Sequence, residues 1–289
     1  MSLNEALADS MAEFICRLSK RLSDDVLDRL KEMAEAERNP AGREIYASMF
    51  RNLEAAERLN RPVCQDTGLP MFFIKAGTRF PYLDDVQDSF TEAVRRATAA
   101  APLRPNAVEI FGGNTGNNIA EKIPWFEWEL APKSDSLEAA VYMSGGGCSL
   151  PGRARVLMPS EGLEGVAAFV LDTIVEFGAN ACPPLVVGVG AGASAEIAAL
   201  LSKKALLRRI GSRNPDPKAA GFERLLEKAV SGLGMGAQGL PGSAAVMAVH
   251  MEFSARHTAT LAAGISFGCW SHRRGRLIYN AKLEPSGGN

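Results

Sequence analysis

The sequence predicts an α/β fold in which a helical N-terminal segment is followed by mixed α/β lobes. Two patterns support this: helical apolar periodicity over roughly the first 60 residues, then short apolar runs that alternate with amphipathic stretches. A length of 289 residues allows one large domain or two lobes with a substantial core. No repeat and no linker marks a boundary, so residues 1–289 are taken as one region, and a division into two lobes stays open.

The N-terminal segment contains three predicted helices. Apolar residues keep to one side of a helix over 11–22, and Ser23 followed by two aspartates is typical of the start of the next helix. Asn39-Pro40 interrupts that second helix. The apolar face between residues 43 and 59 then predicts the third.

The remainder alternates between strand and helix patterns. Further helices are expected at 84–100, 161–177, 194–207 and 217–231. Strands are expected at 71–77, 125–130, 139–147, 185–190, 243–253, 261–267 and 276–283. The run GVGAGAS at 188–194 resembles a dinucleotide loop only weakly, because its third glycine comes one position early and no acid follows about twenty residues on. It is interpreted as a tight strand-to-helix connection.

Charge and the first residues exclude several classes of protein. Lys and Arg total 32 against 33 for Asp and Glu, so the net charge of -1 gives no global attraction to nucleic acid or to an anionic membrane. The N-terminal residues contain acids and do not resemble a secretory signal, and no apolar run is long enough to span a bilayer. A cytoplasmic protein is expected.

Five widely separated cysteines indicate thiol or metal chemistry rather than a disulfide framework, because their number is odd. Three of them lie at predicted element ends: Cys64 precedes Gln-Asp-Thr-Gly, Cys182 precedes two prolines, and Cys269 follows a glycine. Their spacing matches no compact metal motif. Cys16, on a helical face, is interpreted as a buried apolar residue.

Six motifs make the resemblance to a known family specific. They are, in order, RPVCQDTG, LRPNAVEIF, YMSGGGCSLPGR, NACPP, GSRNPDPKAA and HTATLAAGISFGCWSHRRG. They resemble the alpha subunit of class I iron–sulfur-dependent hydro-lyases, the fumarase and L(+)-tartrate dehydratase family, over nearly the whole chain. GGGCSLPGR and GCWSHRRG are most similar to the tartrate dehydratase members.

The resemblance implies a [4Fe-4S] cluster held by Cys64, Cys182 and Cys269, with one open iron. An iron with a free position can act as a Lewis acid on a substrate hydroxyl. Cys148 is placed outside this ligand set, because fumarases of the family can have serine there.

The resemblance also implies the residues that contact substrate. Arg104 and Gln65 match substrate-binding positions, and Asp66 and His257 match catalytic ones. Gly145, Gly146 and Gly147 would let backbone amides approach a carboxylate. Asp66 also fits simple turn capping, and a lone histidine such as His257 is often structural. A purely structural role therefore stays open for both residues.

The expected function is dehydration of L(+)-tartrate, a small dicarboxylate, to oxaloacetate. The alternative within the family is a class I fumarase alpha subunit that hydrates fumarate to L-malate. An alternative of another class is a non-catalytic metal-binding or thiol redox-sensing protein. The resemblance further implies a separate beta subunit, in an assembly of two alpha and two beta chains.

Overall fold

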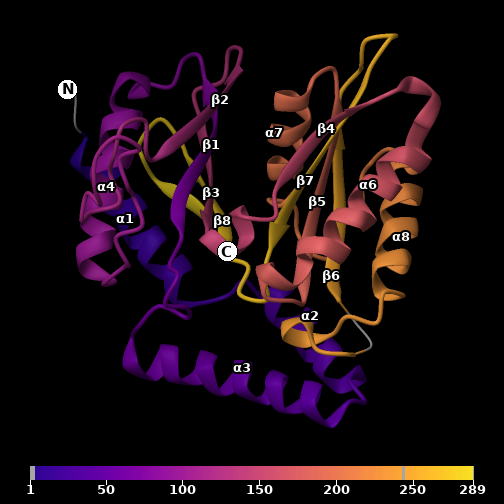
Figure 1. The fold of residues 1–289 in the computed structure, drawn as a ribbon. Coiled ribbons are helices and arrows are strands. Elements are labelled where there is room, and N and C mark those ends of the chain that lie inside the picture. Colours follow the sequence, from indigo (N-terminus) through magenta and orange to yellow (C-terminus); the bar gives the residue numbers. More distant parts are fainter. Residues whose placement is uncertain (1–3, 243–244, 289) are drawn as a thin grey trace. The chain divides into compact units, whose positions relative to one another are not determined.

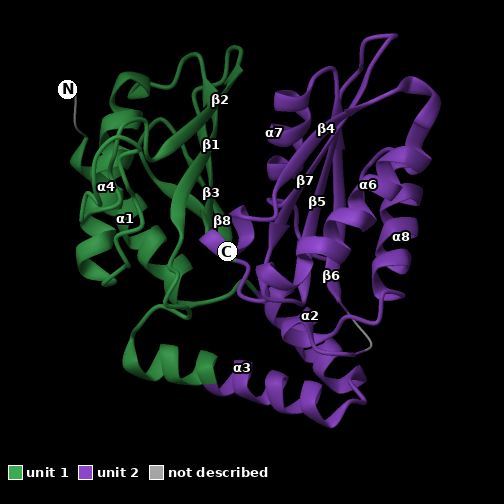
Figure 2. Cartoon of the chain, viewed as in Figure 1, with its two compact units in different colours: residues 1–23, 52–145, 273–289 green, residues 24–51, 146–272 purple. Residues whose placement is uncertain are grey.

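The computed structural model describes residues 4–242 and 245–288, and the chain divides into two compact units (Figure 2). Unit 1 comprises Met1–Ser23, Asn52–Gly145 and Arg273–Asn289, and unit 2 comprises Asp24–Arg51 and Gly146–His272. Both contain helices packed on a sheet, so the predicted α/β class is confirmed. In the described part of the chain, none of the helices combines the length and apolar character that a membrane span requires.

Unit 1 is built on a five-stranded sheet with the order β2-β1-β3-β8-β9 (Figure 1). The strands are β1 (Leu69–Gly77), β2 (Trp125–Ala131), β3 (Leu137–Ser144), β8 (Arg274–Tyr279) and β9 (Pro285–Gly288). β1 runs parallel to β2 and antiparallel to β3, which in turn pairs antiparallel with β8. Helices α1 (Glu5–Lys20) and α4 (Val86–Ala100), the latter preceded by η1 (Leu83–Asp85), pack on each other, and α1 also contacts β3.

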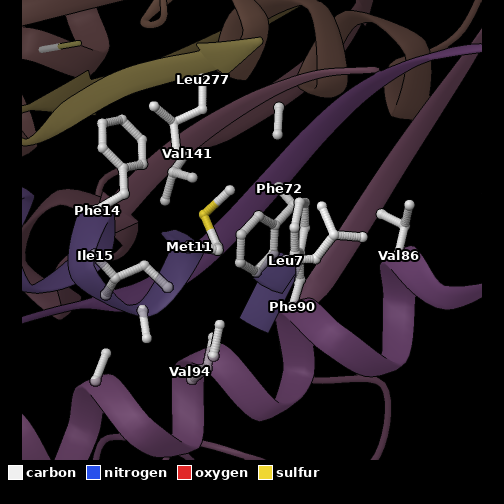
Figure 3. Close-up of a cluster of buried hydrophobic side chains, with 14 of the residues drawn as sticks. Leu7, Met11, Phe14, Ile15, Phe72, Val86, Phe90, Val94, Val141 and Leu277 are labelled. Carbon is white, nitrogen blue, oxygen red and sulfur yellow. The ribbon is translucent and has the colours of Figure 1, made fainter. Parts of the chain in front are cut away.

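The core of unit 1 lies between its sheet and these two helices (Figure 3). Met11 and Phe14 of α1 are almost fully buried, as the helical periodicity of the sequence predicts. Phe72 of β1 reaches α4, where its ring centroid lies 5.3 Å from that of Phe90. The first helix is therefore held by tertiary packing of its apolar face.

Unit 2 has a four-stranded sheet with the order β4-β7-β5-β6, covered by helices on both faces (Figure 1). The strands are β4 (Arg153–Leu157), β5 (Leu185–Gly192), β6 (Val246–Phe253) and β7 (Leu261–Gly268). The helices are α2 (Asp24–Ala36), α5 (Gly146–Ser149), α6 (Gly162–Phe177), α7 (Ala195–Ala205) and α8 (Pro217–Ser231), with short turns η2 (Pro159–Glu161), η3 (Gly178–Ala181) and η4 (Ala237–Gly239). Helix α3 (Pro40–Leu59) begins in unit 2 and ends in unit 1.

Several predicted boundaries are wrong for identifiable reasons. The third helix begins at Pro40 rather than at 43, because proline fits the first helical turn and the Asn39 Oδ1 accepts from the amide of Ala41 at 3.0 Å. The strand expected at 276–283 ends at Tyr279, where a turn begins. In the strand expected at 243–253, residues 243–244 lie outside the described residues.

The glycine-rich run at 188–194 is confirmed as a strand-to-helix connection. Gly188 and Gly190 lie within β5, and two residues separate the end of that strand from the start of α7. A Cβ at Gly190 would overlap the carbonyl oxygen of Ala198, and one at Gly188 would overlap that of Ser202. These glycines therefore let α7 pack directly on the strand backbone.

Tyr46 of α3 is a buried phenol with no hydrogen-bond partner among the described residues. Burial, and next the negative charge of Glu37, raise its pKa to about 12 from 10.0. Below pH 10 the Tyr46 phenol is neutral in both the folded and the unfolded chain. As pH rises from about 10 to about 12 the unfolded chain ionises first, so this group's contribution to the free energy of unfolding falls.

Tyr46→Phe is therefore expected to leave the free energy of unfolding at pH 7 unchanged or to raise it by up to ~1 kcal/mol. Above pH 10 the variant should lose less stability than the wild type. Urea unfolding at pH 7 and at pH 11 checks both expectations. A loss of stability at pH 7 would show that the hydroxyl does have a favourable partner.

Candidate active site

A tight turn over residues 64–68 carries three of the predicted site residues into β1 of unit 1. Gly68 has a φ of 78°, and a Cβ there would lie 2.9 Å from the carbonyl carbons of Met143 and Ser144. Only glycine fits this conformation and this approach. The turn is thereby held against the C-terminal end of β3. Cys64 is half-buried and Gln65 is exposed, with 3.4 Å between the Cys64 Sγ and the Gln65 Oε1.

Asp66 lies over the first glycine of the predicted carboxylate loop. A Cβ at Gly145 would come within 2.8 Å of the Asp66 Oδ2. The Asp66 Oδ1 accepts from the amide of Gly68 at 3.2 Å and from the Asn106 Nδ2 at 3.3 Å. The carbonyl oxygen of Asp66 accepts from the buried Arg273 at 2.8 Å. The carboxylate thus has a defined position beside the backbone of Gly145.

Arg104 lies next to the same turn. The backbone amide of Arg104 donates to the Thr67 Oγ1 at 3.0 Å, and Arg104 is exposed to solvent. An exposed guanidinium on a segment bonded to this turn can bind one carboxylate of a diacid. The structure therefore brings together Gln65, Asp66, Arg104 and Gly145 within unit 1.

Unit 2 brings together two of the predicted cysteine ligands. Cys182 precedes β5 and Cys269 follows β7, and these strands pair antiparallel with Val186 opposite Gly268. The amide of Trp270 donates to the carbonyl oxygen of Cys182 at 3.2 Å. Both cysteines are half-buried. The antiparallel pairing thus places residues 87 positions apart side by side.

Cys148 lies at this same end of the unit 2 sheet. It is buried on α5, which contacts both η3 and β7, and a Cβ at its neighbour Gly147 would lie 2.9 Å from the carbonyl oxygen of Asn180. Burial lowers the pKa of the nearby Lys203, and the charge of Cys148 acts against that shift. Of the glycine triplet, Gly145 belongs to unit 1, whereas Gly146 and Gly147 open α5 in unit 2.

His257 lies at the opposite end of β7 from Cys269. It is exposed in the connection between β6 and β7, and its Nδ1 accepts from the amide of Ala259 at 3.1 Å. The eight residues of β7, at ~3.3 Å each, put roughly 25 Å between the two ends of the strand. The structure of unit 2 does not bring His257 to the cysteines, and its catalytic role stays a prediction.

A comparison with known protein families shows which family this chain belongs to. The family model described as fumarate hydratase (Fumerase) matches residues 8–278. The chain belongs to this family. The resemblance inferred from the motifs is therefore confirmed, and as a member of the fumarate hydratase family the chain is a hydro-lyase.

Curated proteins similar to this chain have a more specific name than the family. The L(+)-tartrate dehydratase subunit alpha of Escherichia coli (strain K12) is 52% identical over 278 residues, which cover 96% of this chain and 92% of the relative. The protein of the same name from Shigella sonnei (strain Ss046) gives the same values. The putative L(+)-tartrate dehydratase subunit alpha of Methanocaldococcus jannaschii is 35% identical over 283 residues, with 96% and 99% covered.

The fumarate hydratase family is known for iron–sulfur-dependent hydro-lyases, and the cysteines of this chain fit such a group in their donor chemistry. Thiolates are the usual protein ligands of iron–sulfur clusters. Cys182 and Cys269 are adjacent in unit 2, and Cys64 belongs to unit 1. Over residues 4–242 and 245–288, no group of three or more Cys, His, Asp or Glu side chains is gathered in a form that could hold a metal ion.

Three residues of this family member support the site without having been predicted from the sequence. Arg273 is buried and donates to the carbonyl oxygen of Asp66. Asn106 bonds to the same aspartate, and Asn118 bonds to the segment that carries Arg104. Asparagine is common in turns, and this loop is rich in glycine and asparagine. The sequence therefore contained no signal that distinguished Asn106 and Asn118 from the other loop residues.

Proposed function

We propose that this chain is the alpha subunit of an enzyme that dehydrates L(+)-tartrate to oxaloacetate. The observation that carries the proposal is 52% identity, over nearly the full length of both chains, to proteins named for that activity. The placement of Asp66 beside the exposed Arg104 supports it, because a diacid needs a cation for its carboxylate and a group that handles a proton.

The proposed cluster ligands are Cys64, Cys182 and Cys269, and residues 1–289 are proposed to be one catalytic region. A bound [4Fe-4S] cluster with one iron free of protein thiolate supplies a Lewis acid that makes a substrate hydroxyl a better leaving group. Cysteines that serve as iron ligands must stay reduced, which supports a cytoplasmic location.

The residues of the chain position the diacid and move its proton. Arg104 binds one carboxylate, and the backbone at Gly145–Gly147 together with the Gln65 amide receives further oxygens. Asp66 takes the proton from one hydroxyl-bearing carbon, and the C–H electron pair forms the double bond as hydroxide leaves the next carbon. The resulting enol becomes oxaloacetate as its hydroxyl proton moves to the neighbouring carbon, and the hydroxide leaves as water with the proton that Asp66 took. His257 is the second proposed proton-handling group.

Hydration of fumarate to L-malate is the second candidate function. The description of the matching family as fumarate hydratase favours it. The two reactions add or remove water across the same two carbons of a C4 diacid. They differ in the second hydroxyl group of tartrate, so the same residues serve either substrate.

A separate beta subunit, in an assembly of two alpha and two beta chains, is part of the proposal. Support comes from the word alpha in the names of the relatives and from apolar side chains on unit 1. Ile110 is 90% and Phe111 103% exposed, and both line an open pocket of about 710 Å³ with Trp125. Fully exposed apolar groups of this size are typical of an interface. The charged residues of the pocket are Glu109, Glu121 and Lys122, so a partner with basic residues around an apolar centre fits it.

Phe111→Ser is expected to weaken binding of the beta subunit by about tenfold or more in Kd, because a central aromatic side chain is lost. The stability of the chain should not change, since the phenyl ring is fully exposed. Leu59→Ser, at an apolar residue 61% exposed on α3, is the matched control. Sedimentation of the two subunits together measures Kd. Unchanged binding would contradict the interface, and loss of self-association instead would assign it to a second copy of this chain.

The test of the proposed function is anaerobic assay of oxaloacetate formation from L(+)-tartrate by the reconstituted chain, with and without its beta subunit. Turnover is expected only with both subunits. Turnover at the same rate without the beta subunit would contradict the partner, and no turnover of tartrate or of fumarate with both subunits would contradict the function.

A further inference from the structure

Asn118 is a fully buried asparagine in the long connection between α4 and β2 of unit 1. Its φ is 62°, a left-handed conformation that asparagine tolerates better than most residues. Burying a carboxamide is costly unless its polar atoms are bonded, so the partners of this side chain indicate what it is there to hold.

The Asn118 side chain bonds to the backbone on both sides of Pro105. Its Oδ1 accepts from the amide of Asn106 at 2.6 Å, and its Nδ2 donates to the carbonyl oxygen of Arg104 at 3.1 Å. The same Nδ2 donates to the Thr98 Oγ1 at 3.1 Å, and that hydroxyl donates to the carbonyl oxygen of Val94 within α4 at 2.7 Å. One carboxamide therefore ties the segment 104–106 to a packed helix.

Segment 104–106 is also bonded to the turn over residues 64–68. The Arg104 amide donates to the Thr67 Oγ1 at 3.0 Å, and the Asn106 Nδ2 donates to the Asp66 Oδ1 at 3.3 Å. The backbone that carries Arg104 is thus held between Asn118 and the turn that carries Asp66. Pro105 has no backbone N–H, so the two amides of this segment, those of Arg104 and Asn106, are both bonded. The proline ring also restricts the backbone.

We propose that Asn118 is a positioning residue that sets the distance between Arg104 and Asp66, an inference that rests on the proposed function of those two residues. Asn118 is fully buried and acts only through the segment it bonds. Because a displacement of about 1 Å in a substrate-binding group can cost on the order of 10²-fold in rate, release of this segment should act on catalysis before it acts on folding.

Asn118→Gly tests this, because glycine accepts the positive φ and lacks the carboxamide. Asn117→Gly is the matched control, since the Asn117 Oδ1 accepts only from the nearby amide of Ile119 at 3.0 Å among the bonds that the structure describes for it. In the enzyme with its beta subunit, Asn118→Gly should lower kcat/KM for L(+)-tartrate by about 10²-fold. The control should retain at least about half of the wild-type value.

Hydrogen exchange of the chain provides a readout that does not depend on activity. Asn118→Gly should speed exchange at the Arg104 and Asn106 amides while the β3 amides keep their protection. Asn118→Asp, which retains an acceptor for the Asn106 amide, should restore protection there and recover part of the activity, and it takes over the test if the glycine variant does not fold.

Wild-type kcat/KM in Asn118→Gly, a loss equal to that of Asn117→Gly, or unchanged exchange at 104–106 would each overturn the proposal. Failure of the proposed function would look different. The wild-type enzyme would then turn over neither tartrate nor fumarate, whereas the exchange experiment would still decide whether Asn118 holds the segment.

Discussion

Cys182→Ser is expected to abolish the iron–sulfur cluster and to lower hydro-lyase turnover by about 10³-fold or more. A serine hydroxyl is a poor substitute for thiolate as an iron ligand, and a Lewis acid supplies several kcal/mol of charge stabilisation, each 1.36 kcal/mol of which is worth about tenfold in rate. Iron and sulfide counts and visible absorption after anaerobic reconstitution measure the cluster. Oxaloacetate formation with the beta subunit measures the activity.

Cys148→Ser is the matched control for this prediction. Cys148 is buried at the same end of the unit 2 sheet, on a helix that contacts the segments preceding Cys182 and Cys269. It should keep its cluster and most of its activity. A cluster that survives Cys182→Ser but is lost in Cys148→Ser would show that the ligand set is wrong and that Cys148 belongs to it.

Gly190→Ala is expected to destabilise the chain by about 3 kcal/mol. The added Cβ would overlap the carbonyl oxygen of Ala198 and would lie 2.5 Å from the amide nitrogen of Ser202. Both are backbone atoms of α7, so no side-chain rotation relieves the clash. Relief requires α7 to move away from β5, which breaks packing in the interior of unit 2. Urea unfolding measures the loss.

Gly221→Ala is the matched control within the same unit. Gly221 lies inside α8, where a Cβ would meet nothing within 4 Å. Alanine is a better helix former than glycine, so the variant should gain about 0.5–1 kcal/mol. If Gly190→Ala were as stable as the wild type, direct packing of α7 on the strand backbone would be contradicted.

The elements with strong apolar periodicity were predictable, and two strands with little apolar pattern were not. β4 exposes four of its five residues, so its sequence RARVL lacks the alternation of a half-buried strand. β9 consists of Pro285–Gly288 and has no apolar pattern at all. Both strands form because a neighbouring edge, β7 or β8, offers unpaired backbone groups.

The candidate site was predictable only where motifs carried it. Cys182 and Cys269 were singled out by their settings and by the family resemblance, but their adjacency follows from the β5–β7 pairing, a non-local contact that spacing does not reveal. His257 was singled out by the family resemblance, but an extended strand occupies most of the eleven residues between it and Cys269. The role of Asn118 depends on the path of a loop and on bonds to three separate segments, none of which a local pattern encodes.

A competition assay tests the central claim most directly. The anaerobically reconstituted alpha and beta subunits are given equal concentrations of L(+)-tartrate and fumarate, and NMR follows oxaloacetate and L-malate in the same tube. The ratio of initial rates is the ratio of the two kcat/KM values. We expect oxaloacetate to form faster than malate, and both products to be lost in Cys182→Ser. Malate as the dominant product would contradict tartrate as the substrate, and the absence of both products would contradict a hydro-lyase acting on C4 diacids.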